Sequence, residues 1–187
     1  QSVFSFVISI QIQHYMKKGL FVSLTVLFAM IVLTVSANDS TKLVSTKTVI
    51  ADPDNAGLKM PAGFGALKAA DNLGRARHIV ATAQGGVYVK LERLVDGKGI
   101  VYLTDADGDG KMEIKNSFAN YIGTGIAIKN GYLYASSNQE VFRYKLNDKG
   151  EVIDATAPQR IVTGLLDKRQ HASKSIALDD AGNIYVN

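Results

Sequence analysis

Pairs of short apolar segments recur three times along the chain, and a polar or glycine-containing turn separates the two members of each pair. The first segments begin at Ile79, Ile126 and Ile176, so the unit repeats after 47 and then 50 residues. Short apolar segments bounded by turn residues predict β-strands. A repeat of this length in an all-β pattern is typical of stacked or radial sheets, of which the β-propeller is the commonest.

Each of the first two repeat units predicts four strands, as a propeller blade requires. The first unit covers residues 74–118, the second covers 120–165, and the third begins at residue 170 and runs to 187. The predicted strands of the first two units are 78–83, 86–91, 99–104, 112–118, 125–128, 132–136, 140–146 and 159–163. The second strand of every unit carries a tyrosine at the same place, and we predict that these side chains pack between neighbouring blades: Tyr88, Tyr134 and Tyr185.

The pattern therefore predicts an all-β fold, a β-propeller of four-stranded blades over residues 61–187. A propeller has at least about four blades, whereas this pattern provides about two and a half. We expect the propeller domain in this sequence to be incomplete.

The region before the propeller reads as a leader. A short basic start, a long apolar run and two small residues follow one another over residues 16–37. This order is typical of a secretory signal peptide and predicts export to the periplasm or out of the cell. An uncleaved membrane anchor is the alternative, because the apolar run is near the minimum length of a span. Residues 1–15 are interpreted as upstream read-through, and residues 38–60 as a polar leader.

Composition narrows the classes of function. The chain has no cysteine, which excludes a disulfide scaffold and argues against a zinc site. It has 21 Lys and Arg residues against 17 Asp and Glu residues, and the basic residues are scattered rather than gathered in a stripe. We therefore predict no nucleic-acid partner.

Acidic residues alternate in the turn between the third and fourth predicted strands of the first unit. Asp105, Asp107 and Asp109 are followed by Gly110, which is the spacing that begins a calcium-binding loop, and Glu113 can add a further oxygen. No helices are predicted on either side, so the loop is not an EF-hand. The alternative is a hairpin turn without a metal, because aspartate and glycine also favour turns. We expect any calcium bound here to be structural.

Polar residues precede the first strand of each unit, where the loops of a propeller approach its central channel. His171 lies five residues before the first apolar residue of the third unit, next to Gln170, and Asn120 precedes the second unit in a similar way. Arg77 and Lys174 each lie two residues before such a strand position, where they can face an anionic ligand. A neutral histidine there suits a general base near pH 7. The alternatives are an ordinary loop histidine and solvated surface charges.

Five segments together resemble the glucose/sorbosone dehydrogenase family, and in particular its sorbosone-type branch. They are residues 73–78, 105–110, 123–127, 144–146 and 171–185. The resemblance spans about residues 57–187. It implies a six-bladed propeller in the complete protein and a soluble quinoprotein that uses pyrroloquinoline quinone (PQQ) and calcium. The activity that it implies is oxidation of a sugar or a related aldehyde or alcohol.

Carried over residue by residue, the resemblance implies that His171 is the general base that removes the sugar hydroxyl proton. Gln170 stands where glucose-oxidising members have an aspartate that contacts the cofactor, and Asn120 stands near a glutamine with the same role. Arg77 and Lys174 are the cations that we expect to contact the quinone. The other residues that hold the cofactor in that family would fall after Asn187.

Other functions remain open at this point. A non-catalytic propeller that binds a glycan or a protein partner is favoured by the changed residues at positions 120 and 170. Lactone hydrolysis at a channel calcium is a third possibility. The dehydrogenase hypothesis requires a small sugar substrate and an external electron acceptor, such as a cytochrome. It predicts no membrane contact beyond an uncleaved signal segment.

Overall fold

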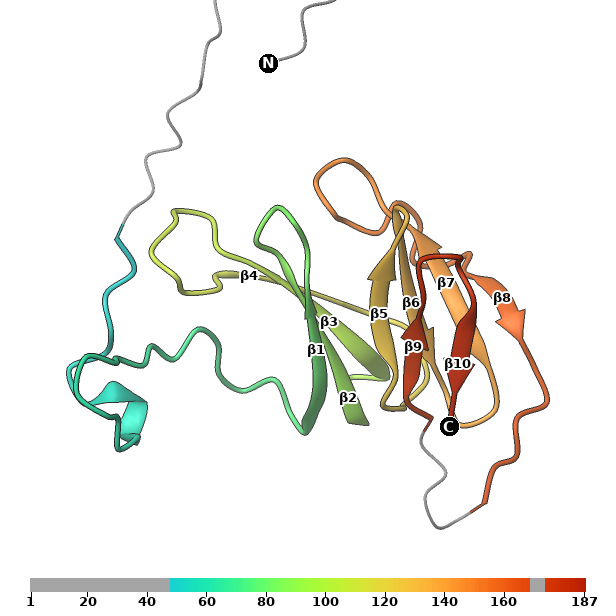
Figure 1. Cartoon of the computed structure of the whole chain (residues 1–187), viewed down its shortest axis with the longest axis horizontal. Helices are drawn as coiled ribbons and strands as arrows, with labels where there is room; N and C mark the ends of the chain where they lie inside the picture. The colour runs from blue at the N-terminus through green and yellow to red at the C-terminus, as the bar shows by residue number, and fades with distance from the viewer. Residues whose placement is uncertain (1–47, 169–173) are drawn as a thin grey trace, which may run out of the picture. The chain divides into compact units, whose positions relative to one another are not determined.

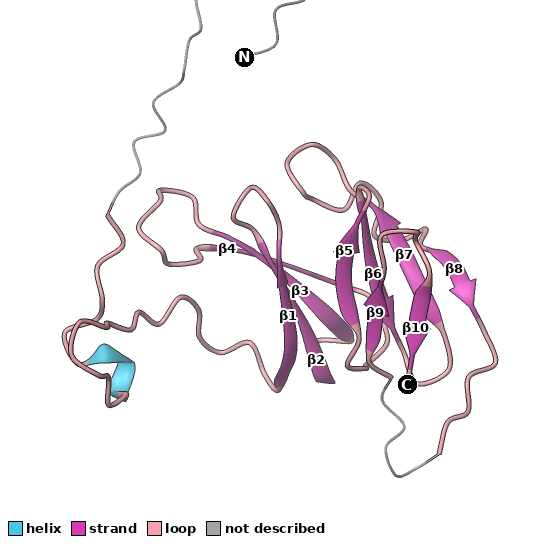
Figure 2. Ribbon diagram, viewed as in Figure 1, coloured by secondary structure: helices cyan, strands magenta, loops and turns pink. Residues whose placement is uncertain are grey.

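The computed structural model describes residues 48–168 and 174–187, which belong to one compact unit, Val44–Asn187. The described residues are almost entirely strands and loops, and their helical content is the short 3-10 turn η1 (Asn55–Gly57) (Figure 2). Within these residues no helix is long and apolar enough to cross a membrane. The predicted signal segment, residues 16–37, lies outside the described residues.

Three antiparallel sheets follow one another along the chain (Figure 1). Sheet 1 has the order β1-β2-β3-β4 and sheet 2 the order β5-β6-β7-β8, while β9 and β10 form a two-stranded sheet 3. The strands are β1 (Ala76–Ala81), β2 (Val87–Val95), β3 (Lys98–Thr104), β4 (Ile114–Phe118), β5 (Ile126–Lys129), β6 (Tyr132–Ser136), β7 (Val141–Lys145), β8 (Gln159–Val162), β9 (Ile176–Leu178) and β10 (Ile184–Val186). The predicted all-β class and the four-stranded units are confirmed, and the described residues form part of a β-propeller.

The sheets pack face to face through apolar clusters. Side chains of sheet 1 and sheet 2 share a core that includes Tyr88, Ile100, Leu133 and Tyr144, all of them almost fully buried. A second cluster joins the other face of sheet 2 to Ile176 of sheet 3. The first strands of successive sheets, β1, β5 and β9, also contact one another. This arrangement makes β1, β5 and β9 the inner strands of successive blades.

Two of the three repeated tyrosines pack between neighbouring sheets. Tyr88 is fully buried towards sheet 2, and Tyr134 is 7% exposed in the cluster shared with sheet 3. Tyr185 is 58% exposed, because no other described sheet covers its face of sheet 3, so its packing between blades stays a prediction. Its neighbours in β10, Ile184 and Val186, point to sheet 2 and leave Tyr185 on the opposite face.

The hairpin between β2 and β3 is longer than predicted. The predicted strand ended at Leu91, where the apolar alternation stops, but β2 continues to Val95. The turn falls at Asp96 and Gly97, which both have positive φ, 49° and 73°. An Asp-Gly pair with this backbone is the strongest short hairpin signal. The turn is thus set by the Asp-Gly pair, which lies beyond the point where the apolar alternation ends.

Candidate functional site

The antiparallel strands sort the loops into two groups. The inner strands β1, β5 and β9 begin at one end of the sheets, which we call the site end; the connection from β4 to β5 (residues 119–125) and the hairpin from β6 to β7 also lie there. The loop between β3 and β4 lies at the opposite end, the far end. The described residues predicted to contact the quinone are Arg77, Asn120 and Lys174, and all three lie at the site end. The predicted metal loop lies at the far end.

Arg77 sits at an irregularity in the innermost strand of sheet 1. The register of β1 against β2 shifts between Ala76, which pairs with Leu91, and His78, which pairs with Lys90. A bulge of this kind redirects a side chain and occurs often beside functional sites. Arg77 is exposed, so its guanidinium is accessible at the site end.

His78 is the described histidine at this end of the sheets. Its Nδ1 lies 3.1 Å from the carbonyl oxygen of Thr124, in the connection that leads to β5. With the proton on Nδ1, the ring donates to that carbonyl and its Nε2 becomes the acceptor. The base predicted from the sequence is His171. His171 and Gln170 both lie outside the described residues, so their roles stay predictions.

The main chain of Lys174 is fixed where the chain approaches β9. Its carbonyl oxygen accepts hydrogen bonds from the Gly125 amide at 2.7 Å and from the Ser136 hydroxyl at 2.6 Å. The Lys174 side chain is half-buried. The approaches to the second and third inner strands are therefore joined directly by hydrogen bonds.

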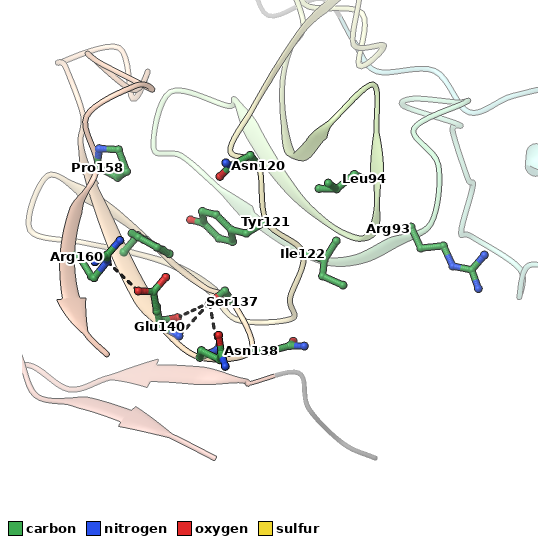
Figure 3. A pocket seen from close by; sticks show the side chains of 12 residues that line it. Arg93, Leu94, Asn120, Tyr121, Ile122, Ser137, Asn138, Glu140, Pro158 and Arg160 are labelled. Atoms are coloured by element: carbon green, nitrogen blue, oxygen red, sulfur yellow. Dashed lines mark hydrogen bonds and ion pairs between the residues drawn. The ribbon is translucent and has the colours of Figure 1, made fainter. Parts of the chain in front are cut away.

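An open groove of about 810 Å³ borders the 119–125 connection (Figure 3). Asn120 is exposed at this groove, and the Tyr121 ring stacks on Phe142 with their centroids 4.7 Å apart. Arg160 and Glu140 form an ion pair of 2.9 Å on its other side. Asn120, one of the predicted site residues, therefore lines a cavity large enough for a small molecule.

Lys90 also lies beside this connection, and it is not among the site residues predicted from the sequence. It is completely buried on β2, and burial lowers the pKa of its ammonium from 10.5 to about 7. Its Nζ donates a hydrogen bond of 2.9 Å to the carbonyl oxygen of Tyr121 and lies 3.9 Å from the centroid of the Tyr121 ring. A lysine inside an otherwise apolar strand, Val87–Leu91, was the available signal.

The four carboxylates of the predicted metal loop come together at the far end. One oxygen from each of Asp105, Asp107, Asp109 and Glu113 lies within 4.8 Å of the others. Asp105 accepts hydrogen bonds from the amides of Gly110 and Gly108, and these bonds hold the pKa of its carboxyl below the usual range. A cluster of hard carboxylate oxygen atoms fits the coordination chemistry of calcium.

The chain matches the model of the TrAA12-like family over residues 58–187. A comparison with curated proteins gives no match. Two solved structures of the Trichoderma reesei carbohydrate-active enzyme family AA12, a calcium and an iodide structure, are similar to this chain, each with 24% identity, a TM-score of 0.52 and 63% of this chain covered. The holo form of the pyranose dehydrogenase PQQ domain from Coprinopsis cinerea is similar with 19% identity and a TM-score of 0.50 over 61% of this chain. The chain spans 30%, 31% and 27% of these three structures, respectively, and the likeness supports the fold.

Proposed function

Because the chain belongs to the TrAA12-like family, we propose that it is a sugar oxidoreductase that works with PQQ. Similar solved structures include a PQQ domain of a pyranose dehydrogenase and a carbohydrate-active enzyme. The observation on this chain that carries the proposal is the grouping of Arg77, Asn120 and Lys174 at one end of the sheets. The sorbosone-type branch is a finer proposal that rests on the sequence segments alone.

The residues at the site end suit a planar quinone with several carboxylates. Arg77 is exposed and its planar guanidinium can bind a carboxylate through two parallel hydrogen bonds. Lys174 adds a second positive charge, and the amide of Asn120 can donate to a carbonyl or carboxylate oxygen. Gln170 is a further proposed contact. When bound, PQQ supplies the acceptor for the two electrons that leave the sugar.

The chain's own contribution to the reaction is proton removal. We assign His171 as the general base that takes the hydroxyl proton from the sugar carbon being oxidised. A neutral imidazole is suited to this step near pH 7, because its ordinary pKa is about 6.5. The positive charges of Arg77 and Lys174 favour binding of an anionic cofactor at the site end.

Dye-coupled oxidation of a panel of aldoses and related aldehydes tests the proposal. The full-length protein is assayed after reconstitution with PQQ and calcium, and in parallel with calcium alone. We expect activity only with PQQ, and the preferred sugar then identifies the substrate. Binding of PQQ without oxidation of any of these substrates would contradict the assigned reaction.

If neither quinone binding nor oxidation occurs, the oxidoreductase proposal fails. A glycan array and a partner search then test the non-catalytic propeller, and a lactonase assay without quinone tests hydrolysis. The exported location, through residues 16–37, and an external electron acceptor such as a cytochrome are parts of the same proposal. They are checked by mass spectrometry of the mature N-terminus and by reduction of a cytochrome during turnover.

We also propose that the cluster of Asp105, Asp107, Asp109 and Glu113 holds a structural calcium ion. Its position at the far end, away from Arg77, Asn120 and Lys174, separates it from the proposed quinone site. Position twelve of the loop, Asn116, lies within β4 and pairs with Tyr102. Glu113 is therefore the residue that completes the carboxylate group.

Calcium removal is expected to lower the melting temperature by several degrees. Binding to the folded state alone stabilises it by about 2.7 kcal/mol at 100 times the dissociation constant, and a melting temperature shifts by roughly 2–4 °C per kcal/mol in a protein of this size. Thermal unfolding is measured with calcium and with EGTA, in the wild type and in Asp105→Asn. Asp148→Asn, at an exposed loop position, is the matched control. A calcium effect that persists undiminished in Asp105→Asn would place the ion elsewhere.

A further inference from the structure

Lys90 occupies an unusual place between the first two sheets. Its partners across sheet 1 are His78 on β1 and Ile100 on β3, and Ile100 belongs to the core shared with sheet 2. Lys90 therefore faces sheet 2, and its side chain is completely inaccessible to solvent. A lysine is almost never fully buried without a partner, because desolvation disfavours its charge. Its Nζ donates a hydrogen bond to the carbonyl oxygen of Tyr121 and lies over the ring of the same residue.

The equivalent residue of sheet 2 makes the same type of contact. Lys90 lies two residues after Tyr88, and Ser136 lies two residues after the repeated Tyr134. Ser136 is also completely buried, and its hydroxyl donates to the carbonyl oxygen of Lys174 at 2.6 Å. In both sheets this position donates a hydrogen bond to a main-chain carbonyl on the approach to the next inner strand.

The longer side chain reaches further from the strand. Ser136 binds a carbonyl two residues before Ile176, whereas Lys90 binds a carbonyl five residues before Ile126. Lys90 can therefore hold the middle of the 119–125 connection, which a serine at the same position could not reach. The contact is specific to the connection that carries Asn120.

Neighbouring strands also approach the backbone of the 119–125 connection closely. The Gly99 amide donates to the carbonyl oxygen of Ala119 at 2.7 Å, and a Cβ atom on Gly99 would collide with the carbonyl of Tyr121. A Cβ atom on Gly123 would collide with the carbonyl of Ser136. These close approaches place the backbone of the connection against sheet 1 on one side and sheet 2 on the other, and the Lys90 hydrogen bond joins the same segment to sheet 1.

We propose that Lys90 is a positioning residue, which holds the 119–125 connection so that Asn120 is kept in the conformation that binds the quinone. Tyr121 transmits the contact, because its carbonyl accepts the Lys90 hydrogen bond and Asn120 directly precedes it. The inference rests on the proposed function for the identity of the ligand. The holding of the connection itself rests on the contacts of Lys90 alone.

Lys90→Met tests this role, because methionine has a similar length but cannot donate a hydrogen bond, and its flexible side chain fits a buried site. Val101→Ala is the matched control: Val101 is buried on the opposite face of sheet 1, away from the connection. Hydrogen exchange is followed by mass spectrometry in peptides that cover residues 119–125. PQQ affinity is measured by titration well below the melting temperature of both variants.

We expect Lys90→Met to accelerate exchange in the connection and to weaken PQQ binding by about tenfold, as loss of a hydrogen bond to a charged group implies. Val101→Ala should lower stability and leave both readouts unchanged. Unchanged exchange in Lys90→Met, or unchanged affinity where the wild type binds PQQ, would overturn the inference. If the wild type binds no PQQ, the proposed function fails, and the exchange data still decide whether Lys90 holds the connection.

Discussion

Replacing His171 with glutamine is expected to lower the kcat for sugar oxidation by about 10²–10⁴-fold, the usual contribution of a general base. Glutamine keeps a polar side chain of similar size but cannot take a proton. The change is therefore expected to leave PQQ binding largely intact. Steady-state kinetics at saturating PQQ, with the PQQ dissociation constant measured separately, distinguish lost proton transfer from lost cofactor.

His78→Gln is the appropriate comparison for this variant. His78 lies at the site end, and its ring is engaged with the carbonyl of Thr124. We expect His78→Gln to change kcat much less than His171→Gln does. The opposite result, with turnover lost in His78→Gln and kept in His171→Gln, would show that the residue carried over from the glucose/sorbosone dehydrogenase family is the wrong base.

The pH dependence of kcat/KM is a second test of whether His171 is the base. A histidine base must be neutral to act, so kcat/KM of the wild type should fall as the pH decreases through the pKa of His171. In His171→Gln this acidic limb should disappear from the small remaining activity. An acidic limb that survives unchanged would mean that another group accepts the proton.

The fold could be predicted because the apolar pattern repeats. The same succession of strand, turn and tyrosine strand starts at Ile79, Ile126 and Ile176, and the structure has β1, β5 and β9 at these places. A strand's alternation also indicates which side chains share a face. It does not show which face another described sheet covers, so the same pattern occurs at Tyr88, which is fully buried, and at Tyr185, which is 58% exposed.

The candidate site was predicted less completely. The spacing of Asp105, Asp107 and Asp109 was sufficient to predict a cluster, because the geometry of a short turn is local. The separation of this cluster from Arg77 and Lys174 required the strand order, which the spacing does not contain. The burial of Lys90 could not be predicted from the strand order alone, since it arises only when sheet 2 packs against sheet 1.

Lys90→Met is also expected to change how stability depends on pH. Burial lowers the pKa of Lys90 to about 7 in the folded protein, whereas an unfolded lysine keeps the value of 10.5. Between these values the unfolded chain holds one more proton than the folded chain, so this group makes stability rise with pH by up to about 1.4 kcal/mol per unit. Below pH 7 both states are protonated, and the full cost of burying the charge is present.

The variant should therefore gain most, relative to the wild type, below pH 7, and its advantage should shrink as the pH approaches 10. The difference between the two pKa values limits this gain in the free energy of unfolding to about 5 kcal/mol. Loss of the hydrogen bond to Tyr121 offsets roughly 1.5–3 kcal/mol of it at every pH where Lys90 is charged. Denaturant unfolding of the full-length variant and wild type, at intervals from pH 6 to pH 10, measures the difference between their free energies of unfolding. Lys98→Met is the control, because it replaces an exposed lysine of β3 in the same way. If Lys98→Met and Lys90→Met show the same pH dependence, Lys90 does not carry a perturbed charge, and its contact with the Tyr121 carbonyl has to be understood as that of an ordinary ammonium group.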